Sequence, residues 1–263
     1  MLLSIIFLVS CELSEEIKYN TFYDGDKIVI HGYISLNDGI KVCVKRTVPP
    51  NQIDRNDKIS DVTLYLFENN IIIDTLVPID DYYYTSSKGL TLKMDALYHI
   101  ETVSQTLPKV ISEPQKIPVP IEFDTLYIQT EEMTYYARLL GFFHRKQNDV
   151  GYYIKHNSFY EGKTNSVFGN DELFNPYGII EDIASDPYSI DINLGNASEF
   201  DSVEVALYSL SSDFTKFLKS IQYYESSKDD PFYEYTYPVF SNIKGGYGIF
   251  GSYSYRRKYM IIK

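Results

Sequence analysis

The chain has 263 residues, 44% of them hydrophobic, and its 36 acidic and 24 basic residues give a formal net charge of −12. This apolar content excludes a disordered protein, and the length allows one large domain or two of modest size. The acidic balance argues against nucleic acid and anionic membrane surfaces as partners, because both carry the same sign of charge. With only two Cys, a disulfide scaffold and a Cys-based zinc site are also excluded.

The first residues have the pattern of an export signal. An uncharged, mostly apolar run precedes Cys11 and is far shorter than the roughly 20 apolar residues of a membrane-spanning helix. The sequence Leu8-Val9-Ser10-Cys11 resembles a bacterial lipobox, in which the peptidase recognises Leu8, Val9 and Ser10 and Cys11 receives the lipid. We predict a signal peptide over 1–10 and a membrane anchor on Cys11. The alternative is a buried N-terminal strand with an incidental Cys.

Acidic residues follow the predicted anchor directly. Glu12, Glu15 and Glu16 lie in the segment 11–26, and their position resembles the surface-export signal of Bacteroidetes-type lipoproteins. A solvated tether is the alternative, because charge-rich segments beside a membrane stay extended. The segment is a lipidated acidic tether in either case. We expect the protein in the outer membrane, facing the cell exterior.

Residues 27–107 show an alternation of period two, which is typical of β-strands. Five strands are expected, at residues 28–36, 40–45, 62–66, 71–73 and 97–103. The turn Asn37-Asp38-Gly39 joins the first two. Short strands at roughly ten-residue spacing, with turn residues between them, predict an immunoglobulin-like β-sandwich.

A Pro-rich segment, 108–121, predicts a stiff crossover between two domains, because Pro at this density blocks helices and central strands. Beyond it, residues 122–263 predict a second, larger β-sandwich or barrel-like domain. Its expected elements are a strand at 123–128, a hairpin of 135–144 with 151–156, loops over 157–200, a strand at 203–207 and an amphipathic helix near 212–225. The predicted fold class is therefore all-β with one helix.

Several segments occur in an order that is typical of one protein family. They are Leu8–Cys11, Ile28–Ile34, Lys45–Pro49, Phe123–Leu126, Phe214–Tyr224 and Asn242–Ser254. The last contains the most specific piece, Gly-Gly-x-Gly-x-Phe-Gly. Together they resemble the Bacteroidetes cell-envelope lipoproteins that carry domain of unknown function 4249. The resemblance implies a lipoprotein often found alongside TonB-dependent outer-membrane receptors, and it brings no catalytic residues.

The glycine-rich segment Gly246–Gly251 matches G-x-G-x-x-G in letters only. A dinucleotide site needs this loop between a strand and a helix, and only 12 residues follow it here. A glycine bend leading into a final strand accounts for it better. Cys43 has no partner His or Cys close in sequence, which favours a partly covered thiol without a catalytic role.

The four His do not form a metal-binding pattern. His99 shares its strand phase with Glu101, which predicts a solvated face. His144 and His156 would approach each other across the expected hairpin but lack a carboxylate to complete a site. Acidic pairs such as Asp80-Asp81 are explained by solvated loops. We expect no cofactor, no metal and no enzymatic activity.

Tyrosine is the compositional outlier, with 26 residues. Tyr suits β-strands, but consecutive Tyr residues in a strand point to opposite faces, so some rings face outward. The candidate binding surface is Tyr233, Tyr235 and Tyr237, in a Pro-bounded loop.

These observations favour a non-catalytic binding or accessory component, acting with a TonB-dependent receptor in nutrient uptake. The alternative is a stand-alone glycan-binding or adhesive surface module that uses its Tyr-rich loops. A third hypothesis, a hydrolase with scattered carboxylates, requires two of them to converge in a cleft.

Overall fold

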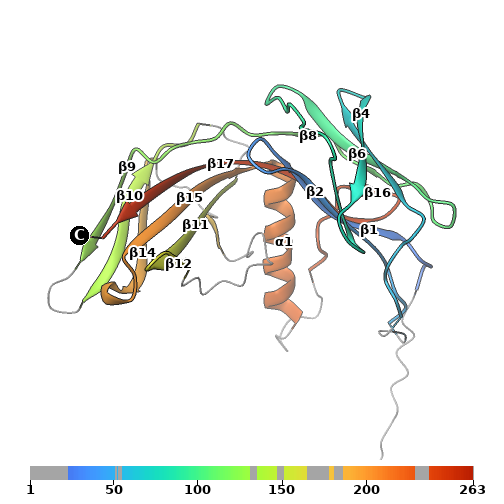
Figure 1. Cartoon of the computed structure of the whole chain (residues 1–263). Helices are drawn as coiled ribbons and strands as arrows, with labels where there is room; N and C mark the ends of the chain where they lie inside the picture. Colours follow the sequence, from blue (N-terminus) through green and yellow to red (C-terminus); the bar gives the residue numbers. More distant parts are fainter. Residues whose placement is uncertain are drawn as a thin grey trace, which may run out of the picture.

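The computed structural model describes residues 23–50, 52, 55–130, 135–146, 151–164, 178–180, 186–228 and 237–262. The predicted signal peptide, lipidation site and most of the tether lie outside these residues. The described chain is built of β-strands and one α-helix, α1 (Ser212–Lys228), which confirms the predicted all-β class (Figure 1). None of its helices is long and apolar enough to cross a membrane.

The first half contributes strands β1–β8 to a fourteen-stranded sheet. Their bounds are β1 Ile28–Ser35, β2 Gly39–Arg46, β3 Thr63–Glu68, β4 Ile71–Pro78, β5 Tyr83–Thr85, β6 Leu97–Val103, β7 Ile111–Ser112 and β8 Gln115–Lys116. The five strands expected in this half are confirmed, including the β1–β2 hairpin. Gly39 lies at φ 71° in its turn, the left-handed conformation that glycine adopts at low cost.

The second half is divided between two sheets. Its elements are β9 Thr125–Thr130, β10 Tyr136–Phe143, β11 Gly151–Tyr160, β12 Lys163–Thr164, β13 Ile179–Ile180, β14 Tyr188–Asn196, η2 Ala197–Glu199, β15 Ser202–Leu210, β16 Ile243–Lys244 and β17 Tyr247–Ile261. Strands β14, β10 and β9 form a separate three-stranded sheet, in that order, and the other strands join the large sheet.

The predicted hairpin of 135–144 with 151–156 is wrong. β10 pairs with β9 and β14, whereas β11 pairs with β15 in the other sheet. The two strands face each other across a core, where the ring of Phe143 lies 5.4 Å from that of Tyr152. Both strands present apolar residues to this core, so their sequence pattern fits packing across two layers as well as it fits a hairpin.

Residues 157–200 contain more regular structure than the predicted loops. β11 continues to Tyr160, and β14 follows at Tyr188–Asn196. Ile190, Ile192 and Leu194 alternate along β14 and pack toward the core. The alternation is short and is surrounded by Asn, Asp and Gly, which is typical of loops, so the sequence pattern does not predict a strand here. The strand is stabilised by its long antiparallel pairing with β10.

Strand β17 connects the two halves. It pairs in parallel with β1 through Tyr253 and antiparallel with β15 along Ser202–Leu210. The large sheet is therefore continuous across the predicted crossover at 108–121, and it arches over α1 (Figure 1). The division into two domains remains a prediction.

Side chains of β17 reach three cores, because successive residues of a strand point to opposite faces. Phe250 lies in the core of the first half, and Met260 packs against the core between the two sheets of the second half. On the opposite face, Tyr253 joins a third core under α1, together with Phe214 and Phe217 of the helix. The helix thus covers the concave face of the sheet, as its apolar spacing predicts.

Candidate binding surface

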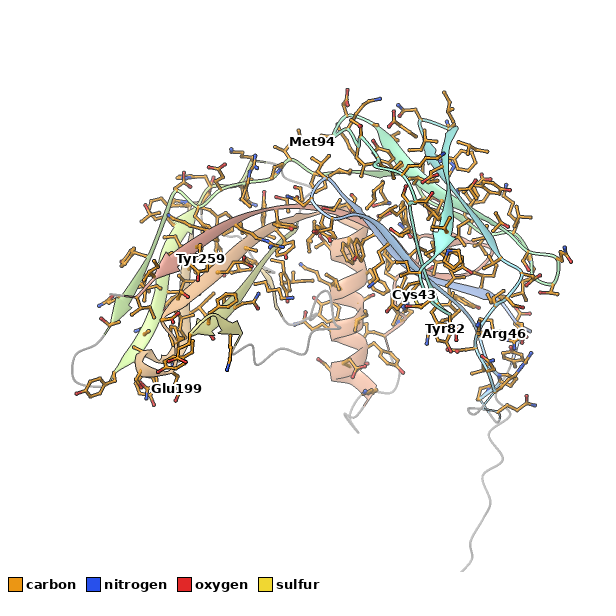
Figure 2. All side chains as sticks on the ribbon, viewed as in Figure 1. Cys43, Arg46, Tyr82, Met94, Glu199 and Tyr259 are labelled. Atoms are coloured by element: carbon orange, nitrogen blue, oxygen red, sulfur yellow. The ribbon has the colours of Figure 1, made fainter. Side chains whose placement is uncertain are left out.

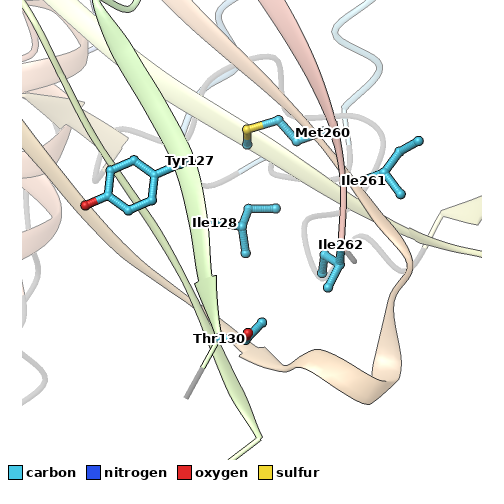
Figure 3. Close-up of a pocket in the computed structure, with 6 residues that line it drawn as sticks. All are labelled: Tyr127, Ile128, Thr130, Met260, Ile261 and Ile262. Carbon is cyan, nitrogen blue, oxygen red and sulfur yellow. The ribbon is translucent and has the colours of Figure 1, made fainter. Parts of the chain in front are cut away.

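A groove of about 410 Å³ lies between β9 and the end of β17 (Figure 3). Its lining residues are Tyr127, Ile128, Thr130, Met260, Ile261 and Ile262. This volume falls within the ~300–1,000 Å³ that is usual for ligand sites. Most of the lining residues carry apolar or aromatic side chains, and polar atoms are exposed in the groove beside the apolar ones. The lining comes from β9 and from the end of β17, which belong to two different sheets.

Strand alternation places the lining side chains on different sides of the groove. Ile128, Met260 and Ile262 point into it and continue into the core of the second half (Figure 3). Tyr127 and Ile261 point away to either side, and the side chain of Ile261 is 70% exposed. The groove is therefore an opening of the core, with apolar side chains on its outer flanks.

Two strand edges beside the groove pair with no other strand in the part of the chain that the structure describes. β9 is the outer strand of the three-stranded sheet. β17 pairs with β1 only as far as Tyr253, so among the described residues the stretch from Ser254 to Ile261 has a strand, β15, on one side alone. This edge of β17 is open because β1 ends at Ser35 and turns back into β2, while β17 continues to Ile261.

The open stretch of β17 is basic in an otherwise acidic protein. Arg256, Arg257 and Lys258 follow one another and are all exposed. Arg256 lies 3.5 Å from Glu122, and Arg257 lies 3.7 Å from Glu204. These ion pairs are solvent-exposed and contribute little to stability.

Exposed tyrosines surround the same end of the molecule. They are Tyr127, Tyr135, Tyr136, Tyr160 and Tyr259. Backbone hydrogen bonds from Ala197 to Tyr135 and from Asp201 to Phe159 bring these strand ends together. Tyr259 and Glu199 lie toward this end, away from Arg46 and Tyr82 of the first half (Figure 2). Exposed Tyr clusters are typical of protein interfaces.

A second set of tyrosines is structural. The hydroxyls of Tyr253 and Tyr255 donate to the two carboxylate oxygens of Asp38, at 2.8 and 3.0 Å. Burial raises the pKa of Tyr253 and of Tyr208 far above the ordinary value, so both hydroxyls stay neutral. Burial likewise raises the pKa of Tyr33 to about 12. These contacts bind the β1–β2 turn to β17.

The residues predicted as sites are only partly described. Leu8, Val9, Ser10, Cys11, Glu12, Glu15, Glu16, Tyr233 and Tyr235 lie outside the described residues. Tyr237 is described: it is 48% exposed, and its ring lies 5.8 Å from that of Tyr223, near the end of α1. This pair lies on a different part of the fold from the groove.

The thiol and the histidines take separate places. Cys43 is buried on β2, and burial raises the pKa of its thiol, which disfavours the reactive thiolate. His156 lies on β11 of the large sheet, whereas His144 directly follows β10 of the other sheet, and its Nδ1 lies 2.9 Å from Asp124. Among the described residues, no three His, Cys, Asp or Glu side chains gather closely enough to hold a metal.

The solvated face predicted for His99 is wrong. This side chain is only 7% exposed and stacks on Phe67 with 4.4 Å between ring centroids. The alternation along β6 does not show that β3 lies beside it and that Phe67 of β3 covers the His99 ring.

The burial of His99 makes stability depend on pH. Burial lowers the pKa of His99 below its ordinary 6.5, although Glu101 opposes this. The unfolded chain then binds the proton more readily, so this contribution is complete above about pH 6.5 and is lost as the pH falls below it. Between about pH 7.5 and 5.5, we expect the free energy of unfolding of wild type to fall more than that of His99→Phe, measured by urea denaturation. Equal losses would contradict the prediction.

The structure defines an all-β protein with one helix and a groove that is open to solvent between β9 and the end of β17. The family model described as Domain of unknown function (DUF4249) matches residues 14–259, so the chain belongs to this family. The family resemblance inferred from the sequence is thereby confirmed. No curated protein matches the chain.

Local sequence patterns do not reveal the groove. The basic residues at the middle of the final strand are visible in the sequence, but the unpaired edge beside them depends on where β1 ends. The exposed Tyr residues of β9 and β17 are likewise indistinguishable in the sequence from the buried Tyr253.

Proposed function

We propose that this protein is a lipid-anchored outer-membrane protein that faces the cell exterior and binds a protein partner, without catalysis, through the groove between β9 and β17. The observation that carries the proposal is the groove itself, which is open to solvent, has mostly apolar and aromatic lining residues, and is bordered by exposed Tyr127, Tyr259 and Ile261. Aromatic and apolar side chains at a depression supply most of the binding energy in protein interfaces.

The place of the groove suits an anchored protein. The described chain begins at Tyr23 in the first half, and the groove lies at the opposite end of the molecule (Figure 1). An anchor on Cys11 would hold the protein by its first half and leave the groove accessible. The partner we propose is a TonB-dependent receptor for nutrient uptake, since proteins of this kind often accompany such receptors.

Affinity purification from solubilised outer membrane tests the proposal. We expect a TonB-dependent receptor to co-purify with wild type and with Ile72→Asp, and to be lost at least ~tenfold with Ile261→Asp, because a charge at the groove opposes desolvation. Ile72 is a matched control, since it is also an exposed Ile on a strand but lies on β4, away from the groove. No receptor in the wild-type sample would contradict the accessory role.

The anchor is tested with Cys11→Ala. We expect this variant to leave the membrane fraction and to lose labelling by a membrane-impermeant reagent on intact cells, because a lipid on Cys11 supplies the anchoring energy. Retained anchoring would contradict the lipoprotein assignment. A groove variant such as Ile261→Asp should stay anchored and labelled, which separates anchoring from binding.

The exposed pair Tyr223 and Tyr237 favours one second function, a stand-alone glycan-binding module. Two neighbouring rings at a surface can stack on the apolar faces of sugars. Glycan binding by the purified protein that Tyr237→Ala abolishes, with no receptor present, would support this function over the accessory role.

A further inference from the structure

We propose that the groove accepts an extended acidic segment of the partner as an added β-strand between β9 and β17. The inference rests on the proposed binding function and deepens it by naming the form and charge of the bound segment. Added strands are held by main-chain hydrogen bonds, and side-chain pockets select their sequence.

The backbone of β17 offers one row of hydrogen-bonding groups to the gap. Even-numbered residues bond toward β15 and its neighbours: Ser252 accepts from Ser211, and Ile262 donates to Asp201. Strand geometry therefore directs the N–H and C=O of odd-numbered residues to the opposite side. Tyr255 uses its N–H to reach the Asn37 side chain. In the described part of the chain, Arg257, Tyr259 and Ile261 have no backbone partner on this side.

β9 and β17 run in the same direction. The hydroxyls of Ser252 and Ser254 donate to the carbonyls of Lys116 and Pro118, and Arg256 pairs with Glu122. Residue numbers therefore increase in the same direction along β17 and along the segment that precedes β9. The chain then continues into β9, beside Met260 and Ile262. One inserted strand could therefore run antiparallel to both neighbours, which is the more stable pairing.

Charge selects the occupant. Arg256 and Lys258 project from the same face of β17 as Met260, toward the layer that holds β9. An inserted segment with acidic side chains opposite these cations and apolar ones opposite Met260 and Ile262 complements the groove. Opposite charges across paired strands are stabilising. The protein's overall charge of −12 makes this basic stretch a local exception.

The same charges disfavour a second copy of this chain. If two β17 edges paired antiparallel about Arg257, Arg256 of one copy would lie opposite Lys258 of the other. Like charges directly opposite each other are destabilising. Charged residues on an edge strand are a common protection against self-pairing. The same charges favour a partner with acidic residues, so this edge binds such a partner in preference to a second copy of the chain.

The experiment uses a phage-displayed library of random peptides of about ten residues, which exceeds the usual strand length of ~6. The full mature protein is the bait, and hydrogen exchange then maps the most enriched peptide. We expect enriched sequences that alternate acidic and apolar residues. Bound peptide should protect the amides of Arg257, Tyr259 and Ile261, along with amides of β9.

Two variants at one position separate backbone from side chain. Tyr259→Pro removes the N–H that faces the gap but no bond to β15, whereas Tyr259→Ala keeps that N–H. Both lose the Tyr259 hydroxyl contact with Ser202, so they are matched. We expect Tyr259→Pro to weaken peptide binding at least ~tenfold more than Tyr259→Ala does, because only the Pro variant loses the main-chain N–H.

Lys258→Glu provides a charge test that leaves the backbone intact. We expect it to weaken acidic peptides about tenfold, while Lys116→Glu, an exposed lysine of β8, leaves them unchanged. The inference would be overturned if no peptide is enriched, or if the bound peptide protects amides elsewhere on the protein. Equal peptide binding by Tyr259→Pro and Tyr259→Ala would also overturn it, as would a dimer paired through β17. If a receptor co-purifies with Tyr259→Pro as with wild type, the inference fails while the accessory function stands. If peptides bind as expected and no receptor co-purifies, the accessory function fails while the inference of an added strand stands.

Discussion

Gly248→Ala is expected to destabilise the protein by about 4 kcal/mol or more, and to prevent accumulation of folded protein if the native stability is ordinary. Gly248 has φ 107°, which alanine adopts only with strain, and a Cβ there would lie 1.9 Å from the carbonyl oxygen of Ile30. Ile30 is its direct partner in the β1–β17 pairing. Relief of the contact would require the two strands to separate at the junction of the halves.

Gly39→Ala is the matched control for Gly248→Ala. Gly39 also has a positive φ, of 71°, but a Cβ there meets no atom within 4 Å. Gly39→Ala should therefore lower the free energy of unfolding only by the cost of placing alanine at a positive φ, about 1–2 kcal/mol. Both variants are compared by guanidinium denaturation followed by circular dichroism. Equal losses would show that β1 and β17 separate easily, contrary to this prediction.

Phe250→Ala is expected to lower the free energy of unfolding by about 3–5 kcal/mol. Phe250 is completely buried in the core of the first half, although it belongs to the last strand of the chain. Its ring packs against the backbone of Gly32, where an added Cβ would lie 3.3 Å from the ring. The loss combines the transfer of the ring to water with the cavity left behind.

The control for Phe250→Ala is Ile261→Ala, at the exposed end of the same strand, with an expected change within ~0.5 kcal/mol. Because β17 supplies residues to all three cores, Phe250→Ala should shift the unfolding of both halves together. Circular dichroism and tyrosine fluorescence should then give one coincident transition. A first half that unfolds separately in the variant would contradict this coupling.

Much of the local structure could be predicted from the sequence. The hairpin around Asn37-Asp38-Gly39, the strand at Leu97–Val103 and helix α1 follow from short-range preferences: a turn residue that accepts a left-handed conformation, and apolar residues at period two or 3.6. The family membership likewise follows from segments read in order. These features depend on neighbours only a few residues apart.

The tertiary structure alone decided how the strands are arranged. Nothing local in β10 and β11 shows that they face each other across a core instead of forming a hairpin, because an apolar face is satisfied equally by either arrangement. The groove likewise depends on which strands pair with one another. It exists because β1 turns back at Asn37 while β17 continues to Ile261, and pairing between residues more than 200 positions apart leaves no local pattern. The sequence by itself determined helix α1 and the main strands of the first half; long-range pairing decided that β14 forms and which strand edges stay open.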